Sequence, residues 1–174
     1  MQSVFNSYLT FPKASTTRFI MTSSPSSTNL RERIEVTARA FLSAYEEGAD
    51  QADASIINRD VTADCTRHLL PASVPEAFGL PADFFFDTTK YQETFANDIK
   101  VLKFKNNTIA NLVIDTEARR AAFTSIADVH VNSGESYPAE LAWFLYFNED
   151  GSKVKKVVEF CDKDVILKMA NTAA

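Results

Sequence analysis

The sequence predicts an α+β protein in which a curved antiparallel sheet wraps on N-terminal helices to form a cone. Three observations support this fold class. The first half of the chain carries apolar residues at helical spacing, the second half reads mainly as long strands separated by short turns, and the two kinds of segment occur in runs rather than in alternation. A long curved sheet packed on helices leaves a cavity between the two layers, so we expect a small apolar molecule to be held there.

The first predicted helix begins at Asn29, where Asn29 and Glu32 have the spacing of a capping box. Gly48 is a plausible end of this helix, and residues 52–58 predict a second, short helix. The apolar stripe of the first helix consists of Leu30, Ile34, Thr37, Ala38, Phe41, Leu42 and Tyr45.

A short strand over residues 61–69 is followed by a loop that is rich in proline but also apolar. Such a loop must lie on or cover another part of the protein. Thr88 or Thr89 is expected to cap a third helix, whose stripe consists of Tyr91, Phe95, Ile99 and Leu102.

The remaining chain predicts an antiparallel meander. Its strands are expected at residues 108–114, 120–131, 137–147 and 154–161, and a short helix follows from Asp162 to near Met169. The segment 148–151, Asn-Glu-Asp-Gly, is a hairpin turn of the glycine-containing type.

Length and composition suit one globular domain: of 174 residues, 45% are hydrophobic and 24% are charged. The net charge of −5 argues against nucleic acid or an anionic membrane as the main partner, because both require a basic surface. Two cysteines, Cys65 and Cys161, are too few for a disulfide scaffold, and His68 and His130 form no convincing zinc set with them. We therefore expect no metal site.

Residues 1–28 form a separate zone rich in Ser and Thr, with no acidic residue before Glu32. The composition resembles a weak organellar transit peptide; the alternatives are an unstructured tail or a working start at Met21. We expect a disordered tail over residues 1–28 and a folded domain over residues 29–174. No signal peptide is visible, so we expect a cytoplasmic protein.

Two charged residues fall on strand faces that look buried, namely Arg67 and Glu159. A buried charge is costly unless it is paired, so the two indicate a mutual ion pair or a shared ligand. Burial without a partner would raise the pKa of Glu159 and suit it to proton transfer. The alternatives are a purely architectural pair, or strand ends that reach water.

Tyr137 brings a phenol to an apolar strand face, either as a hydrogen-bond donor to the cavity or as an ordinary core residue. Tyr91 and Phe95 are expected to be cavity wall or plain core. The chain contains no GxSxG, GxGxxG, P-loop or HExxH motif, so any chemistry should be acid–base work without a cofactor.

Three segments carry a family resemblance: C-T-R-H-L-L-P-A-S at 65–73, G-E-S-Y-P-A-E-L at 134–141, and E-D-G-S-K-V-K-K-V-V-E-F-C-D at 149–162. In this order and spacing they resemble the small SnoaL-like proteins of fungal secondary metabolism, which have a nuclear-transport-factor-2-like cone. That group includes cyclases and isomerases that act on meroterpenoid and indole-alkaloid intermediates. The resemblance extends from about Leu30 to the end of the chain.

The resemblance implies that Arg67, Tyr137 and Glu159 line an active site. The chain departs from the family pattern at Leu141, where a second tyrosine is expected. Glu159 would move a proton, Arg67 would orient Glu159 or hold a developing oxyanion, and Tyr137 would donate a hydrogen bond. We expect the substrate to contact Cys65, Tyr91, Phe95, Leu141 and Trp143.

The function expected from these residues is that of a cofactor-independent isomerase or cyclase acting on a small, apolar, polycyclic intermediate. A dehydratase on the same cone is an alternative, although it would prefer a histidine base and His68 lies on the wrong strand face. A non-catalytic binding or dimerisation module is another. The strand 139–147 is apolar on both faces, which predicts a homodimer formed through the sheet.

Overall fold

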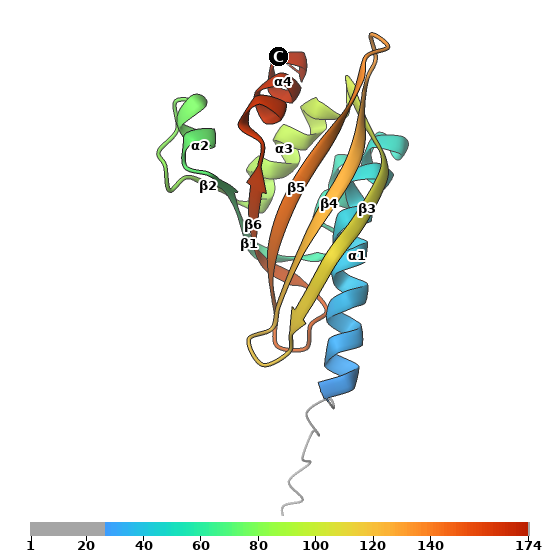
Figure 1. Ribbon diagram of the computed structural model, residues 1–174, viewed down its shortest axis with the longest axis vertical. Coiled ribbons are helices and arrows are strands. Elements are labelled where there is room, and N and C mark those ends of the chain that lie inside the picture. The colour runs from blue at the N-terminus through green and yellow to red at the C-terminus, as the bar shows by residue number, and fades with distance from the viewer. Residues whose placement is uncertain (1–26, 174) are drawn as a thin grey trace, which may run out of the picture.

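The computed structural model describes residues 27–173 and has the predicted α+β architecture, in which helices precede a six-stranded, curved and open sheet (Figure 1). The tail expected over residues 1–28 lies outside the described residues, apart from Ser27 and Thr28, which already belong to the first helix.

The sheet has the strand order β2-β1-β6-β5-β4-β3. The pairing between β1 and β6 is parallel, whereas the other neighbouring pairs are antiparallel, so the predicted meander covers β3 to β6 and β1 joins it at the β6 edge. The strands are β1 (Val61–Leu70), β2 (Phe85–Phe86), β3 (Leu102–Asp115), β4 (Arg120–Val131), β5 (Ser136–Phe147) and β6 (Val154–Cys161).

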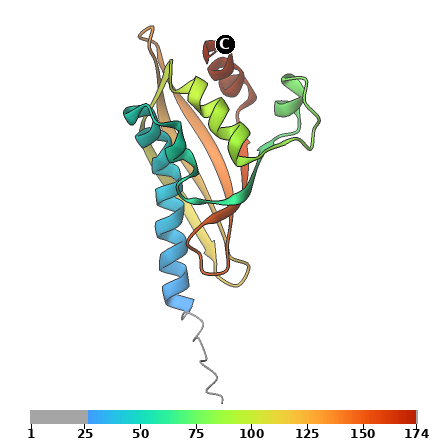
Figure 2. The ribbon, with the colours of Figure 1, turned by 180° about the vertical axis from the view of Figure 1, so that it is seen from behind.

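The long helix α1 and the helix α3 lie against one face of the sheet, while no helix of the described chain covers the opposite face (Figures 1 and 2). The helical elements are α1 (Ser27–Gln51), the 3₁₀ helix η1 (Ala54–Asn58), α2 (Ser73–Ala77), α3 (Thr88–Asp98) and α4 (Lys163–Ala173). Between residues 27 and 173, none of the helices combines the length and the apolar character needed to cross a membrane.

Strand β3 is longer than its sequence indicates, and Leu102, expected on the third helix, is its first residue. Its pairing with β4 is irregular at two points, next to Asn106 and next to Asn111, whose φ angles are 54° and 55°. Asparagine tolerates this left-handed conformation, and each bulge breaks the alternation of side chains along the strand. The same bulges increase the bending of the strand, which helps to curve the sheet around the helices.

The proline-rich loop after β1 contains a helix, α2, that the sequence analysis did not predict. Pro75 is its third residue, a position in the first helical turn where the missing backbone N–H would have had no intrahelical partner. The prolines were therefore compatible with one helical turn.

The turn between β5 and β6 packs against α1 at Gly151. The φ of Gly151 is 75°, and a Cβ atom there would lie 2.9 Å from Cγ1 of Ile34. Thr37 of α1 donates a hydrogen bond of 2.8 Å to the carbonyl of Gly151. Glycine at this position therefore fixes α1 against the end of the hairpin, and thereby holds α1 over the inner face of the sheet.

Candidate active site

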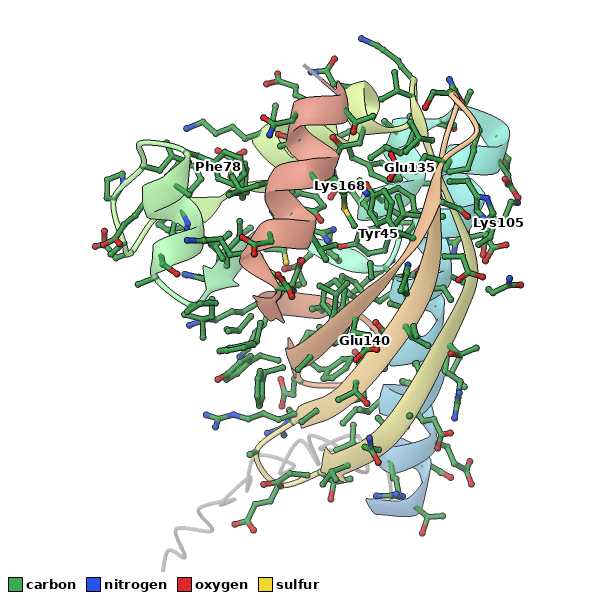
Figure 3. The ribbon with its side chains drawn as sticks, turned by 45° about the horizontal axis from the view of Figure 1, so that its top comes forward. Tyr45, Phe78, Lys105, Glu135, Glu140 and Lys168 are labelled. Atoms are coloured by element: carbon green, nitrogen blue, oxygen red, sulfur yellow. The ribbon has the colours of Figure 1, made fainter. Side chains whose placement is uncertain are left out.

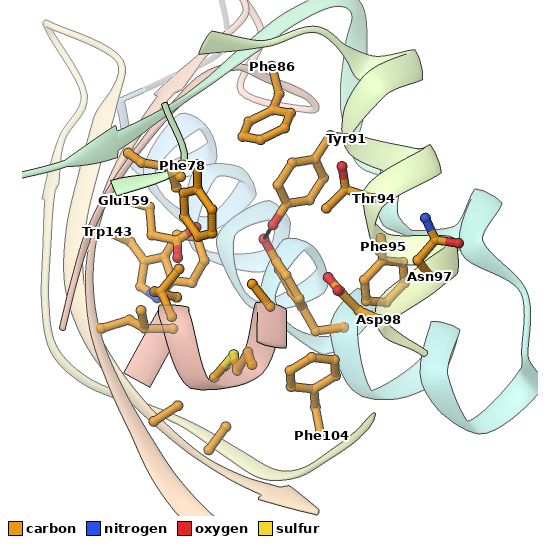
Figure 4. Close-up of a pocket in the computed structure, with 18 of the residues that line it drawn as sticks. Phe78, Phe86, Tyr91, Thr94, Phe95, Asn97, Asp98, Phe104, Trp143 and Glu159 are labelled. Atoms are coloured by element: carbon orange, nitrogen blue, oxygen red, sulfur yellow. Dashed lines mark hydrogen bonds between the residues drawn. The ribbon is translucent and has the colours of Figure 1, made fainter. Parts of the chain in front are cut away.

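A cavity of about 430 Å³ lies between the inner face of the sheet and the helices α1, α3 and α4. Its size is that of a site for a small organic molecule. Most of its wall is apolar, and aromatic rings from both layers surround it (Figure 4): Tyr45, Phe78, Phe86, Tyr91, Phe95, Phe104 and Trp143.

Two segments next to the mouth of the cavity add apolar side chains. Phe78 and Leu80 come from the segment after α2, and Ile166, Met169 and Ala170 come from α4. The sequence analysis predicted that the apolar loop lies on or covers another part of the protein, and the structure places Phe78 and Leu80 at the cavity.

Glu159 of β6 projects its carboxyl group into this cavity (Figure 4). It lies between Leu69 of β1 and Trp143 of β5 in the sheet register, and its exposed fraction is 7%. No described residue donates a hydrogen bond to this carboxyl group or forms an ion pair with it. Burial raises the pKa of Glu159 to about 7, although the nearby charge of Arg67 acts in the opposite direction. Near neutral pH the group can therefore both accept and donate a proton.

Arg67 lies on the same side of the sheet as Glu159, because Leu69 is paired with Glu159 and Arg67 precedes Leu69 by two residues. Its side chain does not line the cavity, and it forms no direct ion pair with Glu159. One guanidinium nitrogen donates to the carbonyl of Ile57 (2.8 Å) and another to the hydroxyl of Tyr45 (3.2 Å).

The guanidinium group of Arg67 also lies over the ring of Tyr91, 4.0 Å from the ring centroid. Its Nε atom is buried and has no hydrogen-bond partner. The aromatic face and two acceptors therefore hold the buried cation in place of a carboxylate. Of the two alternatives offered by the sequence, a mutual ion pair or a shared ligand, no direct ion pair between Arg67 and Glu159 is present among the described residues. Arg67 instead contacts two tyrosines that line the cavity.

Tyr45 of α1 and Tyr91 of α3 form a hydroxyl pair in the cavity wall, with 2.8 Å between their oxygen atoms. Burial raises the pKa of both phenols, so both remain protonated near neutral pH. The hydrogen bond between the two hydroxyl groups uses only one of their two protons. Arg67 donates a further hydrogen bond to the oxygen of Tyr45. One phenol proton is therefore left over for a ligand.

Asp98 is a second carboxyl group in the cavity wall, at the end of α3 (Figure 4). Burial raises its pKa to about 6. The spacing of Tyr91, Phe95 and Asp98 places all three on one face of α3, so helical periodicity could have identified Asp98 from the sequence. Tyr45 could have been found in the same way, as the member of the first helical stripe that carries a phenol.

The structure brings some of the predicted site residues to the cavity and leaves others outside. Tyr91, Phe95, Leu141, Trp143 and Glu159 line it. Cys65 is buried but does not line it, because it lies on β1 two residues before Arg67, toward the closed part of the core. Arg67 reaches the cavity only through its contacts with the tyrosines.

Tyr137 is on the inner face of β5, but it lies beyond the cavity and beneath α4. Its hydroxyl is buried without a hydrogen-bond partner among the described residues, and Tyr137 packs against the cluster of Leu102, Val129 and Ala139, as does Met169 of α4. The ammonium group of Lys168 lies 4.0 Å from the ring centroid and also pairs with Glu135 (Figure 3). Helix α4 therefore covers, through Lys168 and Met169, a part of the sheet that the family resemblance had assigned to the active site.

No protein-family model and no curated protein matches this chain. Among solved structures, it is similar to the BvnE pinacolase from Penicillium brevicompactum, with a TM-score of 0.66, 23% identity, and coverage of 83% of this chain and 92% of that one.

Two further solved structures support the same fold. PrhC from Penicillium brasilianum has a TM-score of 0.66 and 19% identity, over 82% of this chain and 89% of that one. An NTF2-like protein of unknown function from Burkholderia pseudomallei has a TM-score of 0.56 and 11% identity, over 79% and 97%. The predicted resemblance to fungal proteins with this cone is thus confirmed at the level of the fold.

Proposed function

We propose that this protein is an isomerase or cyclase that acts on a polycyclic secondary-metabolite intermediate by acid–base catalysis, without a cofactor. The observation that carries the proposal is the carboxyl group of Glu159. It lies in an apolar cavity without a hydrogen-bond or ion-pair partner among residues 27–173, and burial raises its pKa to about 7. A catalytic acid or base works best when its pKa lies near the working pH.

In the proposed mechanism, the ionised Glu159 removes a proton from a carbon next to a substrate carbonyl. The electron pair of the broken C–H bond moves onto the carbonyl oxygen as an enolate. The remaining proton of the Tyr45–Tyr91 pair donates a hydrogen bond to that oxygen. Protonated Glu159 then returns its proton to another carbon of a conjugated enolate, which completes an isomerisation. In a cyclisation, the enolate carbon instead bonds to a second carbonyl carbon of the substrate, the π electron pair of that carbonyl moves onto its oxygen, and Glu159 protonates this oxygen.

Arg67 contributes through Tyr45 in this proposal. Its hydrogen bond to the oxygen of Tyr45 polarises that phenol and makes the hydroxyl pair a better donor to the substrate. Fixed donors in a cavity that excludes water are a large source of stabilisation for a developing oxyanion. Arg67 is thus a positioning residue, and Glu159 is the proton-transfer group.

The similar structures agree with an enzymatic role. BvnE is called a pinacolase, and a second similar structure, with a TM-score of 0.57, is AclR from Streptomyces galilaeus, described as a candidate hydroxylase. These names concern those proteins, and the low identities transfer only the fold. The enzymatic proposal for the present chain therefore depends on Glu159 and the tyrosine pair.

The proposal can be tested without knowing the substrate. The protein would be incubated in D₂O with a panel of polycyclic ketones, and mass spectrometry would measure the incorporation of deuterium next to the carbonyl. We expect exchange with the native protein and a loss of roughly 10²-fold in the Glu159→Gln variant. Equal exchange rates for the two proteins would exclude Glu159 as the proton-transfer group.

The dehydratase alternative would prefer a histidine base. His68 does not line the cavity; it packs beside Phe85, 5.4 Å between ring centroids, and its nitrogen lies 3.1 Å from the hydroxyl of Thr66. His130 lies on β4 opposite Ser136, on the other side of the sheet from Trp143. This arrangement favours a carboxyl group over a histidine as the catalytic base.

The non-catalytic alternative was suggested by Leu141, which stands where a second tyrosine was expected. Leu141 does line the cavity. The Tyr45–Tyr91 pair supplies hydroxyl groups to the same cavity, so the absence of a tyrosine at position 141 does not leave the cavity without a donor. A binding module would bind a ligand equally well with Glu159 or Gln at this position and would cause no exchange, whereas the enzyme requires the carboxyl group.

A further inference from the structure

The cavity is unbalanced in charge. Its described lining contains two carboxyl groups, Glu159 and Asp98, and no lysine, arginine or histidine. Glu159 has a role in the proposed proton transfer. The mechanism leaves Asp98 unused, so a reason for its presence in an apolar wall must be sought elsewhere.

Asp98 occupies an unfavourable position for a carboxylate. It is the last residue of α3, where the negative end of the helix dipole opposes a negative charge. Phe95 and Phe104 stand beside it in the wall of the cavity (Figure 4). No described residue donates a hydrogen bond to its side chain or forms an ion pair with it. Burying a carboxylate in such surroundings costs free energy unless a partner satisfies it.

The two carboxyl groups come from opposite layers of the fold. Glu159 projects from β6 of the sheet, whereas Asp98 projects from α3 of the helical layer, and both are directed into the cavity (Figure 4). A ligand that fills the cavity can therefore meet Glu159 with one part and Asp98 with another. The apolar wall between them suits a rigid hydrocarbon framework.

We propose that Asp98 is a specificity-determining residue that accepts a hydrogen bond from a donor group, a protonated amine or a hydroxyl, carried by the polycyclic substrate away from its reacting carbon. The inference rests on the function proposed above, because it concerns the same cavity. It narrows the substrate class to a largely apolar polycycle with one polar donor facing α3. Substrates that present an anion or only an acceptor at this place are disfavoured by the carboxyl group.

The donor can be tested with rigid apolar probes that differ in one group: 1-adamantylamine, 1-adamantanol, 1-methyladamantane and adamantane-1-carboxylate. Trp143, the single tryptophan of the chain, lines the cavity, so its fluorescence can report binding. We expect the amine or the alcohol to bind at least about tenfold more tightly than the methyl compound, as expected for a hydrogen bond to a charged group. The carboxylate should bind most weakly, and the tighter of amine and alcohol identifies the kind of donor.

Two variants assign the preference to Asp98. Asp98→Leu removes the acceptor, and we expect it to abolish the preference for both donors. Asp98→Asn removes the charge and keeps an acceptor oxygen, so it should reduce amine binding more than alcohol binding. The matched control is Glu93→Gln, which removes a charge from an exposed position of the same helix and should leave all four affinities within about twofold.

The proposal is overturned if the methyl compound binds as tightly as both donors, if none of the four compounds binds, or if the donor preference persists in both Asp98 variants. Binding is measured without turnover, so these results are independent of the deuterium-exchange test. One combination of results separates the two proposals. If the Asp98 variants lose the donor preference while Glu159→Gln exchanges deuterium at the native rate, the inference on Asp98 is supported and the catalytic role of Glu159 is rejected.

Discussion

The guanidinium group of Arg67 donates a hydrogen bond to the phenol oxygen of Tyr45 across 3.2 Å. It thereby acts on the cavity through a tyrosine and is not the direct counterion of Glu159. Its other contacts, the carbonyl of Ile57 and the face of Tyr91, do not depend on a carboxylate either. Removing the charge of Glu159 should therefore leave Arg67 held as it is.

The first prediction concerns the replacement Glu159→Gln. Gln keeps the size of the side chain but cannot accept a proton near neutral pH, so turnover should fall by roughly 10²-fold or more. The melting temperature should not fall, because no direct ion pair is broken. Turnover and melting would be measured on the same preparations.

An architectural role for Glu159 makes the opposite prediction. Breaking a buried ion pair would cost about 3–5 kcal/mol and lower the melting temperature strongly. A Gln variant that melts much earlier yet turns over normally would refute the catalytic role.

The second prediction concerns the pH dependence of stability. The pKa of Glu159 is about 7 in the folded protein and 4.5 in its ordinary environment, so between these values the folded state holds a proton that the unfolded state releases. The contribution of neutral Glu159 is fully present below about pH 4.5 and is lost as the pH rises to about 7. The native protein should thus lose stability relative to Glu159→Gln over this range.

The full difference is about 3–4 kcal/mol, since each unit between the folded and unfolded pKa values corresponds to about 1.4 kcal/mol. Melting curves of both proteins from pH 4 to pH 8 would measure it, and the titration of Asp98, present in both, cancels in the comparison. A difference that stays constant across this range would show that the pKa of Glu159 is not raised.

The third prediction distinguishes the roles of three tyrosines, Tyr45, Tyr91 and Tyr137, in turnover and stability. Because Arg67 donates to the oxygen of Tyr45, we assign the proton of Tyr45 to the oxygen of Tyr91 and the proton of Tyr91 to the substrate. Tyr91→Phe keeps the ring beneath Arg67 but removes this donor, so turnover should fall by about 10²- to 10³-fold. Tyr45→Phe should also lower the free energy of unfolding by about 1–3 kcal/mol, because a buried nitrogen of Arg67 loses its acceptor.

Tyr137→Phe is the matched control. The hydroxyl of Tyr137 is buried without a partner, so its removal should leave turnover unchanged and stability equal or slightly higher. A larger loss of turnover in Tyr137→Phe than in Tyr91→Phe would show that Tyr137 donates the hydrogen bond to the substrate, as the family resemblance implied.

Alternation and helical periodicity predicted much of the fold, because they report directly which face of an element is buried. They placed Arg67 and Glu159 on inward faces and assigned Tyr91 and Phe95 to one stripe of a helix. They failed at Leu102 and in the first half of β3, because bulges at Asn106 and Asn111 interrupt the alternation that identifies a strand.

The partners of the buried charges were less predictable than their burial. A strand face indicates that Arg67 points inward, but the choice of Tyr45 rather than Glu159 as its acceptor depends on how α1 is seated on the sheet. The position of Tyr137 depends in the same way on α4, which covers that end of β5. Such contacts join elements that are far apart in the sequence, and local patterns carry no information about them.

The last prediction is a homodimer formed through the face of the sheet that no described helix covers (Figure 1). Four large apolar side chains are exposed on this face, one from each strand of the meander: Val113 (66%), Ile126 (42%), Phe144 (46%) and Phe160 (49%). An exposed apolar surface of this kind is typical of a protein interface.

The substitution Phe144→Glu tests this interface. The register places Phe144 beside Ala122 and Val158, near the middle of the face. Phe144→Glu should convert the dimer into a monomer, because it would bury a charge in the interface. Val36→Glu is the control, since Val36 is also an exposed apolar residue (66%) but lies on α1; it should leave the dimer intact. Light scattering at micromolar concentration gives the mass of each protein, and a monomer mass for the unaltered chain would contradict the prediction.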